Sequence, residues 1–589
     1  MCGIVGYLGQ KTKVLNIVNT LEKLEYRGYD SAGVCCQDAE KLTAVKSVGK
    51  IEKLKQKINK KTESGSIIAH TRWATNGEVN TKNCHPHLSF QSVWAVVHNG
   101  IIENHQKIRA LLKQQPQSDT DTAVVSELLE QNNVCDIGGF IETLNSLDGS
   151  FAIVGQCSKK PNTLFVAKRK SPLYLSKNKE GDVLIASDII CFANFSKTYF
   201  SLNDNEFAQV VDGKIEFFDS KCNQIQKVEQ QIEDLFESVS KKHYNHFMIK
   251  EIEEQPQAIK NQVKYYQENQ LLKIFDKEFV SRFNKVVLIG CGTAYHVGLM
   301  GAKYISKLTG LFARAEISSE FLYEHPVFVD NQTLCIFVSQ SGETADTLGA
   351  LAVAKKHNAF CVALTNVVYS SISKQADLVL PVCAGPEIAV ASTKAYVCQL
   401  TALYILASHI KNQLQNKNID FYNKVGSLAE TIFNFDKSTF DNLAEKIKNK
   451  RDVIFIGKGC DFITSQEASL KLKEVTYISS SSYPSGELKH GFLALVETGT
   501  PVFVIAGDKQ TKLKTFNSAS EAESRGADVF VISNEATCKF LGCRLNVDDE
   551  LLFGVAAIVP LQYLAYKVAV AKGFNPDQPR NLAKSVTVE

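Results

Sequence analysis

Cys2 is the first residue whose type and position suggest chemistry. Removal of Met1 would leave a thiol and a free α-amine on the same residue. An α-amine with a pKa near 8 can act as the base for a thiol with a pKa near 8.5, so a separate histidine is not required. The alternative is an ordinary buried cysteine in a first strand, and position alone favours that alternative.

Polar segments between residues 25 and 122 contain further side chains that could take part in a reaction at this cysteine. They are E-Y-R-G-Y-D-S-A-G (25–33), H-T-R-W-A-T-N-G (70–77), H-N-G-I-I-E-N-H (98–105) and S-D-T-D-T (118–122). These segments resemble the glutaminase domain of the class II, N-terminal-nucleophile amidotransferases. An isolated Asn99–Gly100 pair would instead be typical of a tight hairpin turn.

The resemblance implies that Cys2 attacks the carboxamide of glutamine, giving a glutamyl thioester and ammonia. Asn99 and Gly100 would donate two N–H groups to the oxygen that becomes charged. Arg72 would hold the α-carboxylate and Asp121 the α-ammonium, a division that their charges support. Further glutamine contacts are expected from the following residues: Trp73, Thr75 and His85.

Zinc is an alternative for the group formed by Cys84, His85, His87 and His98. Their spacing matches no closed ligand set, and the family that the chain resembles uses no metal here. We therefore expect neither a metal nor a cofactor.

A second chemical motif, S-Q-S-G-E-T (339–344), follows an apolar strand and opens a helix. Hydroxyl groups, a glycine and the free N–H groups of a helix start can bind a phosphate without a lysine. A serine-rich N-cap is the alternative. The motif resembles that of sugar isomerase (SIS) domains, as do C-G-T-A (291–294) and V-A-S-T-K (390–394).

The SIS resemblance implies a set of contacts with fructose 6-phosphate. Ala294 stands where the family usually has serine, which removes one hydroxyl group from the pocket. The expected contacts come from these residues: Thr293, Ser339, Gln340, Ser341, Thr344, Val390, Ser392 and Ala583.

Glu467, Lys471 and Glu474 follow a helical i, i+4, i+7 spacing, so they lie on one helical face. By pattern alone they form a solvated stripe of ion pairs. An apolar residue follows each of them, which gives the helix a core side and leaves the charged side for a cleft. The resemblance makes Glu474 the base that moves a proton between C1 and C2 of the sugar, with Lys471 as a further catalytic residue.

The resemblance places two more catalytic residues near the end of the chain. His490, in Y-P-S-G-E-L-K-H-G (483–491), would open the sugar ring by acid–base catalysis. Lys584, in the tail D-Q-P-R-N-L-A-K-S-V-T-V-E (577–589), would form the Schiff base with the ketose C2. Phe492 replaces the proline that the family usually has.

The elements that must position these residues fall into two kinds. Residues 2–217 have short, turn-bounded apolar runs, which predict an α+β domain with antiparallel sheets; the resemblance implies that these sheets are stacked. A charged helical connector is expected over 218–275, and a catalytic tail over 579–589. Between them, 276–415 and 443–578 read as two α/β copies of one domain with parallel sheets, because Gly290 and Gly457 end matching strands 167 residues apart.

Composition sets limits on the protein's class. A chain of 589 residues with 44% hydrophobic and 22% charged residues is globular rather than disordered, and its net charge of +3 does not suggest nucleic-acid or membrane binding. The sixteen cysteines include no C-x-x-C pair and no signal peptide is evident, so we expect a cytoplasmic protein. Residues 551–571 carry Pro560, Gln562 and Lys567, so we interpret them as a core helix.

Taken over nearly all of its length, the chain resembles the glutamine–fructose-6-phosphate aminotransferase family. The resemblance implies transfer of the amide nitrogen of L-glutamine to D-fructose 6-phosphate, with internal ammonia transfer and isomerisation to D-glucosamine 6-phosphate, by a homodimer. The chain lacks the S-G-G-x-D-S loop of asparagine synthetase. A sugar-phosphate-sensing regulator with relic amidotransferase parts is the other alternative, and it is disfavoured by the intact set Cys2, Asn99, Asp121, Glu474 and Lys584.

Overall fold

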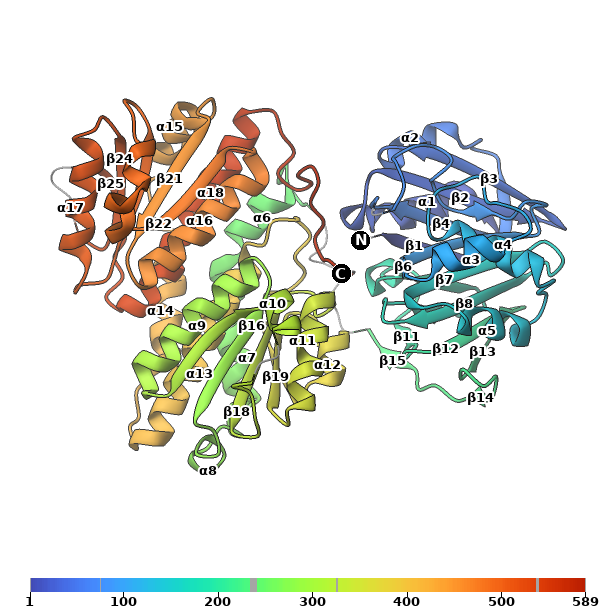
Figure 1. Cartoon of the computed structure of the whole chain (residues 1–589), viewed down its shortest axis with the longest axis horizontal. Coiled ribbons are helices and arrows are strands. Elements are labelled where there is room, and N and C mark those ends of the chain that lie inside the picture. The colour runs from blue at the N-terminus through green and yellow to red at the C-terminus, as the bar shows by residue number, and fades with distance from the viewer. Residues whose placement is uncertain (1, 75, 233–240, 325–326, 536–539, 588–589) are drawn as a thin grey trace. The chain divides into compact units, whose positions relative to one another are not determined.

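The computed structural model describes residues 2–74, 76–232, 241–324, 327–535 and 540–587. The chain forms two compact units, one made of residues 1–238 with 583–589 and the other of residues 239–582. In Figure 1 residues 2–232 of the first unit run from blue to teal, residues 241–582 of the second unit run from green to red, and residues 583–587 are red.

The first unit contains two antiparallel sheets. One has the strand order β15-β11-β9-β10-β1-β4-β2-β3 and the other β14-β13-β12-β8-β7-β6-β5. The strands of the first sheet are β1 (Gly3–Lys13), β2 (Ser31–Asp38), β3 (Lys41–Val48), β4 (Glu63–Arg72), β9 (Tyr174–Lys177), β10 (Val183–Ala186), β11 (Thr198–Ser201) and β15 (Gln230–Gln231). Those of the second are β5 (His87–Leu88), β6 (Trp94–Ile102), β7 (Gly149–Cys157), β8 (Thr163–Arg169), β12 (Glu206–Val211), β13 (Lys214–Phe218) and β14 (Gln224–Ile225).

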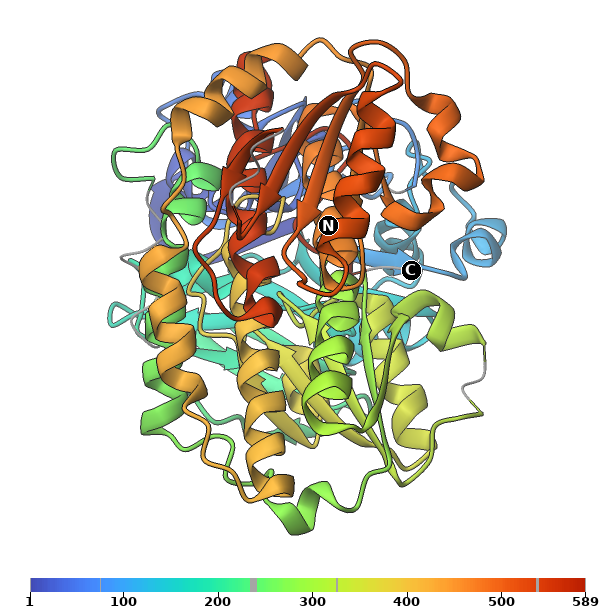
Figure 2. The same ribbon diagram turned by 90° about the vertical axis from the view of Figure 1, so that its left-hand side faces the viewer.

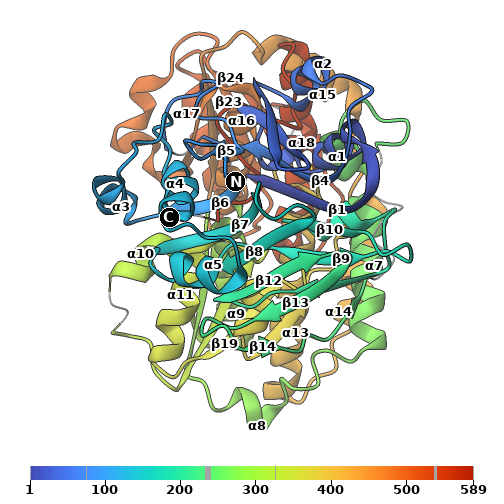
Figure 3. The same cartoon turned by 90° about the vertical axis from the view of Figure 1, so that its right-hand side faces the viewer.

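The two sheets stack on each other, and helices cover their outer faces (Figure 3). Ile68 of β4 and Val154 of β7 belong to the apolar core between the sheets. Helices α1 (Val14–Glu22) and α2 (Ile51–Lys57) cover the first sheet, and α4 (Ala123–Gln131) and α5 (Ile137–Asn145) cover the second. Helix α3 (His105–Leu111) follows β6. The predicted α+β fold with stacked antiparallel sheets is confirmed.

Within residues 218–275, short strands precede the helices. Strands β14 and β15 pair with β13 and β11 of the first unit. Helices α6 (Phe247–Glu253) and α7 (Gln255–Glu268) then belong to the second unit, followed by the short α8 (Lys277–Val280).

The second unit contains two five-stranded parallel sheets with the same order, β17-β16-β18-β19-β20 and β22-β21-β23-β24-β25. The first consists of β16 (Lys285–Gly290), β17 (Phe312–Ile317), β18 (Thr333–Ser339), β19 (Phe360–Thr365) and β20 (Leu378–Pro381). The second consists of β21 (Asp452–Gly457), β22 (Ser479–Pro484), β23 (Pro501–Ala506), β24 (Asp528–Ser533) and β25 (Leu541–Arg544). The predicted parallel repeats are confirmed.

Helices cover both faces of each of these sheets, as Figure 2 shows for the orange second repeat. The first repeat has α9 (Thr293–Thr309), α10 (Ser318–Tyr323), α11 (Ala345–Lys356), α12 (Ser371–Gln375) and α13 (Lys394–Gln415). Helices α14 (Phe421–Thr431) and α15 (Lys437–Ile447) follow, and the second repeat has α16 (Cys460–Thr476), α17 (Lys512–Glu523) and α18 (Glu550–Ala571). One apolar cluster includes residues of both repeats and of α6 and α7, so the repeats share a core.

Helix α18 is long and apolar enough to cross a bilayer, and it is the one such helix in the described part of the chain. Its apolar window is 89% buried within the protein, and its side chains belong to the shared core. The interpretation of this segment as a core helix therefore agrees with the structure.

The strand order predicts where ligands bind in each repeat. A parallel sheet of this order changes direction between its first and third strands, and ligands bind beyond the carboxyl ends of those strands. In the first repeat these strands, β16 and β18, lead directly to Thr293 and Ser339. The topology thus brings together two of the motifs that the sequence singled out.

Candidate active site

Cys2 immediately precedes β1 and is half-buried. The backbone N–H of Trp73 donates to its Sγ over 3.3 Å. Burial raises the pKa of the Cys2 thiol, and this outweighs the opposing effects of that hydrogen bond and of the Arg72 guanidinium. A thiol with a raised pKa needs a base in order to attack, and the sequence predicts that its own α-amine is that base.

The side chain of Asn99, on β6, reaches the backbone of Cys2. Its Nδ2 donates to the Cys2 carbonyl over 3.0 Å. On the other side, Nε2 of His70 lies 3.1 Å from Asn99 Oδ1 and 3.0 Å from the His98 carbonyl. Both partners are acceptors, so Nε2 carries the proton, and the Asn99 amide is fixed with its NH₂ group toward Cys2.

Gly100 is a strand residue rather than part of a hairpin turn. It lies in β6 opposite Phe151 of β7, with a φ of +132°. A Cβ at this position would lie 2.0 Å from the Ser150 carbonyl oxygen. Only glycine fits, and the hairpin interpretation of Asn99–Gly100 is wrong.

Arg72 and Asp121 are both buried in the first unit. The Arg72 guanidinium donates to the backbone carbonyls of Asn76 and Gly77, which orders the loop after β4. Asp121 Oδ2 accepts from the Ile102 N–H over 2.8 Å, at the end of the strand that carries Asn99. Thr75, a predicted glutamine contact, lies outside the described residues.

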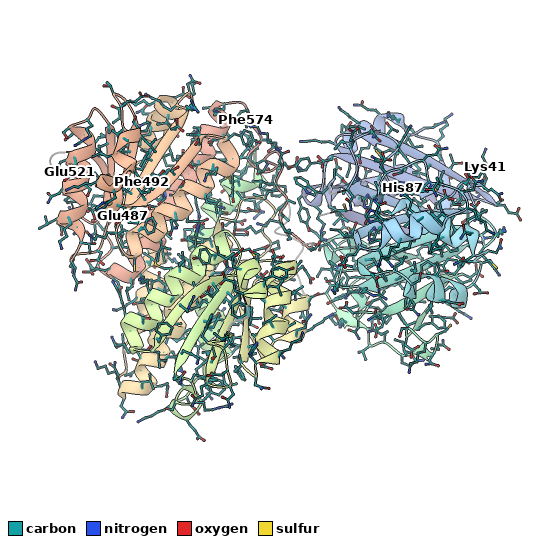
Figure 4. The ribbon with its side chains drawn as sticks, viewed as in Figure 1. Lys41, His87, Glu487, Phe492, Glu521 and Phe574 are labelled. Carbon is teal, nitrogen blue, oxygen red and sulfur yellow. The ribbon has the colours of Figure 1, made fainter. Side chains whose placement is uncertain are left out.

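The buried histidines form a stacked and hydrogen-bonded group. The rings of His70 and His85 stack at 4.1 Å, and His85 packs edge-on against His87, which Figure 4 labels. Thr122 and Thr120 lie within hydrogen-bond distance of His98 and His87. Burial lowers the pKa of all four, to about 3 for His70, so they are neutral. No group of three potential metal ligands occurs among the described residues.

In the second unit, the loop 339–344 lies between β18 and α11. Ser339 Oγ accepts from the Gly342 N–H over 3.0 Å, and Ser341 Oγ accepts from the Glu343 N–H over 3.2 Å. These serines therefore order the loop itself. The N-cap residue Thr344 makes no side-chain capping bond, so within the described structure the start of α11 is available to an anion.

Thr293 of the first repeat meets the charged face of α16 from the second. Lys471 Nζ donates to Thr293 Oγ1 over 3.0 Å and lies 2.6 Å from Glu474 and 3.5 Å from Glu467. Glu467 also accepts from Thr293 and pairs with His296 Nδ1 at 2.7 Å. The side chains of Glu467 and Lys471 are 0% and 1% exposed, so the solvated-stripe interpretation is wrong.

The charges of this cluster determine the protonation of Lys471. Burial by itself lowers the pKa of its amine, but the Glu474 and Glu467 carboxylates more than compensate and the net shift is upward. Lys471 is therefore an ammonium ion held between two carboxylates, and an ammonium ion cannot attack a carbonyl.

Glu387 organises the loop that carries the predicted sugar contacts Val390 and Ser392. It accepts hydrogen bonds from the Ser392 hydroxyl and from the backbone N–H groups of Thr393 and Ala395. The Val390 N–H donates to the backbone carbonyl of Asp577. The loop before α13 is thus fixed by a buried carboxylate.

The two predicted catalytic residues near the end of the chain are both at least partly exposed. His490 is exposed at the end of a 3₁₀ helix (Ser485–His490), and the neighbouring Phe492 stacks on Tyr483 at 3.8 Å; Figure 4 labels Phe492. Ala583 and Lys584 are partly exposed in irregular structure, and residues 583–589 group with the first unit.

The structure thus brings Cys2 and Asn99 together in one unit, and Thr293, Lys471 and Glu474 in the other. Sequence reasoning missed His70, Glu387 and the contact of Glu467 with His296. His70 stands within the H-T-R-W motif, so the motif was a signal for it, and Glu387 is a lone carboxylate three residues before V-A-S-T-K.

Comparisons with known proteins match segments of both units. A glutamine amidotransferase domain matches residues 70–194, and the SIS domain matches twice, at 280–409 and 446–572. The chain is 40% identical, over the whole of both chains, to a glutamine–fructose-6-phosphate aminotransferase (isomerizing) of Clostridium tetani and to one of Clostridium perfringens. The solved C-terminal domain of the glucosamine-fructose-6-phosphate aminotransferase of Francisella tularensis is 32% identical and aligns with a TM-score of 0.53, over 58% of this chain and 99% of its own.

Proposed function

Because the chain belongs to the glutamine–fructose-6-phosphate aminotransferase family, we propose which of its residues carry each step of that reaction. The enzyme transfers the amide nitrogen of L-glutamine to D-fructose 6-phosphate and isomerises the product to D-glucosamine 6-phosphate, releasing L-glutamate. The observation that carries this function is the 40% identity over the full length of both chains. We assign glutamine chemistry to residues 2–217, sugar chemistry to the repeats 276–415 and 443–578, and the imine to the tail 579–589.

Cys2 is the nucleophile of the glutamine step. Its α-amine takes the thiol proton, the sulfur attacks the carboxamide carbon, and the proton passes to the departing ammonia, which leaves a glutamyl thioester that water hydrolyses. The Asn99 amide, oriented by His70, and the Gly100 N–H stabilise the oxyanion. Arg72 and Asp121 hold the two charged groups of glutamine, with Trp73, Thr75 and His85 as further contacts.

Cys2→Ala, or a tag that keeps residues ahead of Cys2, should abolish glutamine hydrolysis, because the thiol or the free amine is lost. Glutamate release measures this step. Full hydrolysis by an uncleaved tagged protein would show that the α-amine is not the base.

The phosphate of fructose 6-phosphate binds the loop 339–344 at the start of α11. Support comes from the position of this loop at the point where the sheet changes direction, and from the uncapped helix start. Ser341→Ala with Thr344→Ala should weaken binding of fructose 6-phosphate in calorimetry, while glutamine hydrolysis remains. Unchanged sugar affinity would place the phosphate elsewhere.

Lys584 forms the imine with the ketose, and Glu474 moves the proton between C1 and C2. The environment of Lys471 supports this assignment, since a lysine held as an ammonium ion by two carboxylates is a poor nucleophile. Borohydride added with fructose 6-phosphate should trap an adduct on Lys584. Lys584→Arg should lose both the adduct and product formation, because arginine keeps the charge but does not shed its proton. Undiminished product would exclude Lys584.

The active enzyme is a homodimer in which His490 serves the sugar site of the partner. Support comes from the exposure of His490 and of Leu495 (59%) on the same segment, because an interface needs exposed apolar side chains. Mixing His490→Ala and Glu474→Gln subunits tests this: random pairing should restore about a quarter of the wild-type activity, since each mixed dimer has one intact site. No recovery would place His490 within its own chain's site.

The compartment that fits the thiol chemistry is the cytoplasm. The cysteines of the described residues are all free thiols. Free thiols on this scale persist in reducing compartments.

A further inference from the structure

The two repeats keep the same backbone where the first strand enters the first helix. Gly292 before α9 has φ 53° and ψ −123°, and Gly459 before α16 has φ 61° and ψ −121°. A Cβ on the glycine that ends each strand would lie 2.8 Å from the backbone of Ala294 in the first repeat and 2.4 Å from that of Asp461 in the second. Ala294 and Asp461 therefore occupy equivalent positions.

The loops after the third strands also match. In the first repeat, Ser341 Oγ accepts from the N–H of Glu343, two residues further on, over 3.2 Å. In the second, Asp508 Oδ1 accepts from the N–H of Gln510, also two residues further on, over 2.9 Å. Asp508 thus takes the place of Ser341, and the second repeat retains the loop geometry of the phosphate site.

What differs is the space in front of that loop. Asp461 is 2% exposed, and its Oδ2 accepts from the N–H groups of Gly507 over 2.8 Å and Asp508 over 3.1 Å. The equivalent first-repeat residue, Ala294, ends in a methyl group, which carries neither charge nor an acceptor. A carboxylate of the protein itself therefore binds the amides that would receive a phosphate.

The charge around the second loop also opposes the binding of a phosphate. Asp508 adds a second carboxylate where the first repeat has a hydroxyl group. Lys307 of α9 lies 3.4 Å from Asp508 Oδ2 and pairs with the protein's own carboxylate. A dianionic phosphate would meet two negative groups within contact distance, which opposes its binding.

We propose that Asp461 is an internal anion that occupies the second repeat's copy of the phosphate site, so that each chain binds a single sugar phosphate. The proposal depends on the assignment of the loop 339–344 as the phosphate site of the first repeat. It makes Asp461 a specificity-determining residue, since it directs the substrate to the first repeat, whose Thr293 contacts Lys471, the ion-pair partner of Glu474.

The test gives the second repeat the residues of the first. Asp461→Ala with Asp508→Ser is introduced into full-length protein that already carries Ser341→Ala and Thr344→Ala, and binding of inorganic phosphate is measured by calorimetry. The parent should bind phosphate more weakly than the wild type, and the quadruple variant should regain the binding of one phosphate per chain. A folded quadruple variant that binds no more than the parent would overturn the proposal. If Asp461→Ala prevents folding, Asp461→Ser is used in its place.

A matched control separates occupancy from charge. In this control, Asp461→Asn replaces Asp461→Ala in the quadruple variant. The asparagine keeps an oxygen acceptor on the two N–H groups, so this variant should bind no more phosphate than the parent. Stronger phosphate binding by the asparagine variant would show that charge alone excludes the anion, against the proposal. Failure of the first-repeat assignment is distinguishable, because fructose 6-phosphate would then bind the parent with unchanged affinity.

Discussion

Replacing His70 by phenylalanine tests how the oxyanion donor is oriented. Phenylalanine keeps a ring that can stack on His85 but removes the Nε2–H that fixes Asn99 Oδ1 at 3.1 Å. Without this hydrogen bond, the orientation of the Asn99 amide that turns its NH₂ group toward Cys2 is held only by the bond from Asn99 Nδ2 to the Cys2 carbonyl. His70→Gln is the matched variant, because the glutamine amide can place a donor where Nε2 stood.

The size of the effect follows from the energy of that hydrogen bond. Leaving a buried acceptor unsatisfied costs about 1–3 kcal/mol. At about 1.36 kcal/mol per tenfold in rate, the loss corresponds to a fall in kcat of roughly 5- to 150-fold. Complete loss of an oxyanion donor, at about 10²–10³-fold, is the upper limit. The KM for glutamine should change little, because His70 contacts the donor and not the charged ends of the substrate.

Steady-state glutamine hydrolysis by the purified full-length enzyme measures this prediction. His70→Gln should retain most of the activity that His70→Phe loses. In an Asn99→Ala background, His70→Phe should cause no further fall in kcat, because the residue that it positions is gone. An unchanged kcat in His70→Phe, or an equal fall with and without Asn99, would show that His70 only packs.

Three further changes test other contacts. Gly100→Ala should destabilise the first unit by about 1–3 kcal/mol and reduce glutamine hydrolysis, because its Cβ meets the Ser150 carbonyl; urea unfolding measures the loss. Burial raises the pKa of Asp461 to about 6 from its ordinary 3.8, so the stability tied to this group is present below pH 3.8 and is lost as the pH rises through 6. The uncharged Asp461→Asn should therefore gain up to about 3 kcal/mol over wild type between pH 4 and pH 7; an equal difference at both pH values would refute the shift. Glu467→Gln should reduce glucosamine 6-phosphate formation but not glutamine hydrolysis, because it removes one of the two carboxylates that hold Lys471; equal losses of both activities would contradict that role.

The repeat was predictable because it rests on local patterns. Gly290 and Gly457 end strands of continuous apolar residues, and a strand followed by a helix implies a parallel sheet wherever it occurs. The same holds for α18, whose proline and lysine within an apolar run indicated a core helix. These inferences depend on residues that are close together in the sequence, which is why they could be made from the sequence alone. The structure confirms them.

The missed contacts depend on packing between distant elements. Glu467 shows a helical spacing with Lys471, and this spacing is equally typical of a solvated face, because no pattern says which helix will cover it. Only the packing of α9 from the other repeat supplies Thr293 and His296. His70 likewise meets Asn99 from a strand of the other sheet, a pairing that neither motif contains.

The most direct test of the account is the complete reaction with labelled glutamine. Wild-type enzyme supplied with amide-¹⁵N glutamine and fructose 6-phosphate should form ¹⁵N-glucosamine 6-phosphate and glutamate in equal amounts. Cys2→Ala should form no labelled product, and Lys584→Arg should release glutamate without amino sugar. Absence of glucosamine 6-phosphate from the wild-type reaction would contradict the account and favour a sugar-phosphate-sensing regulator.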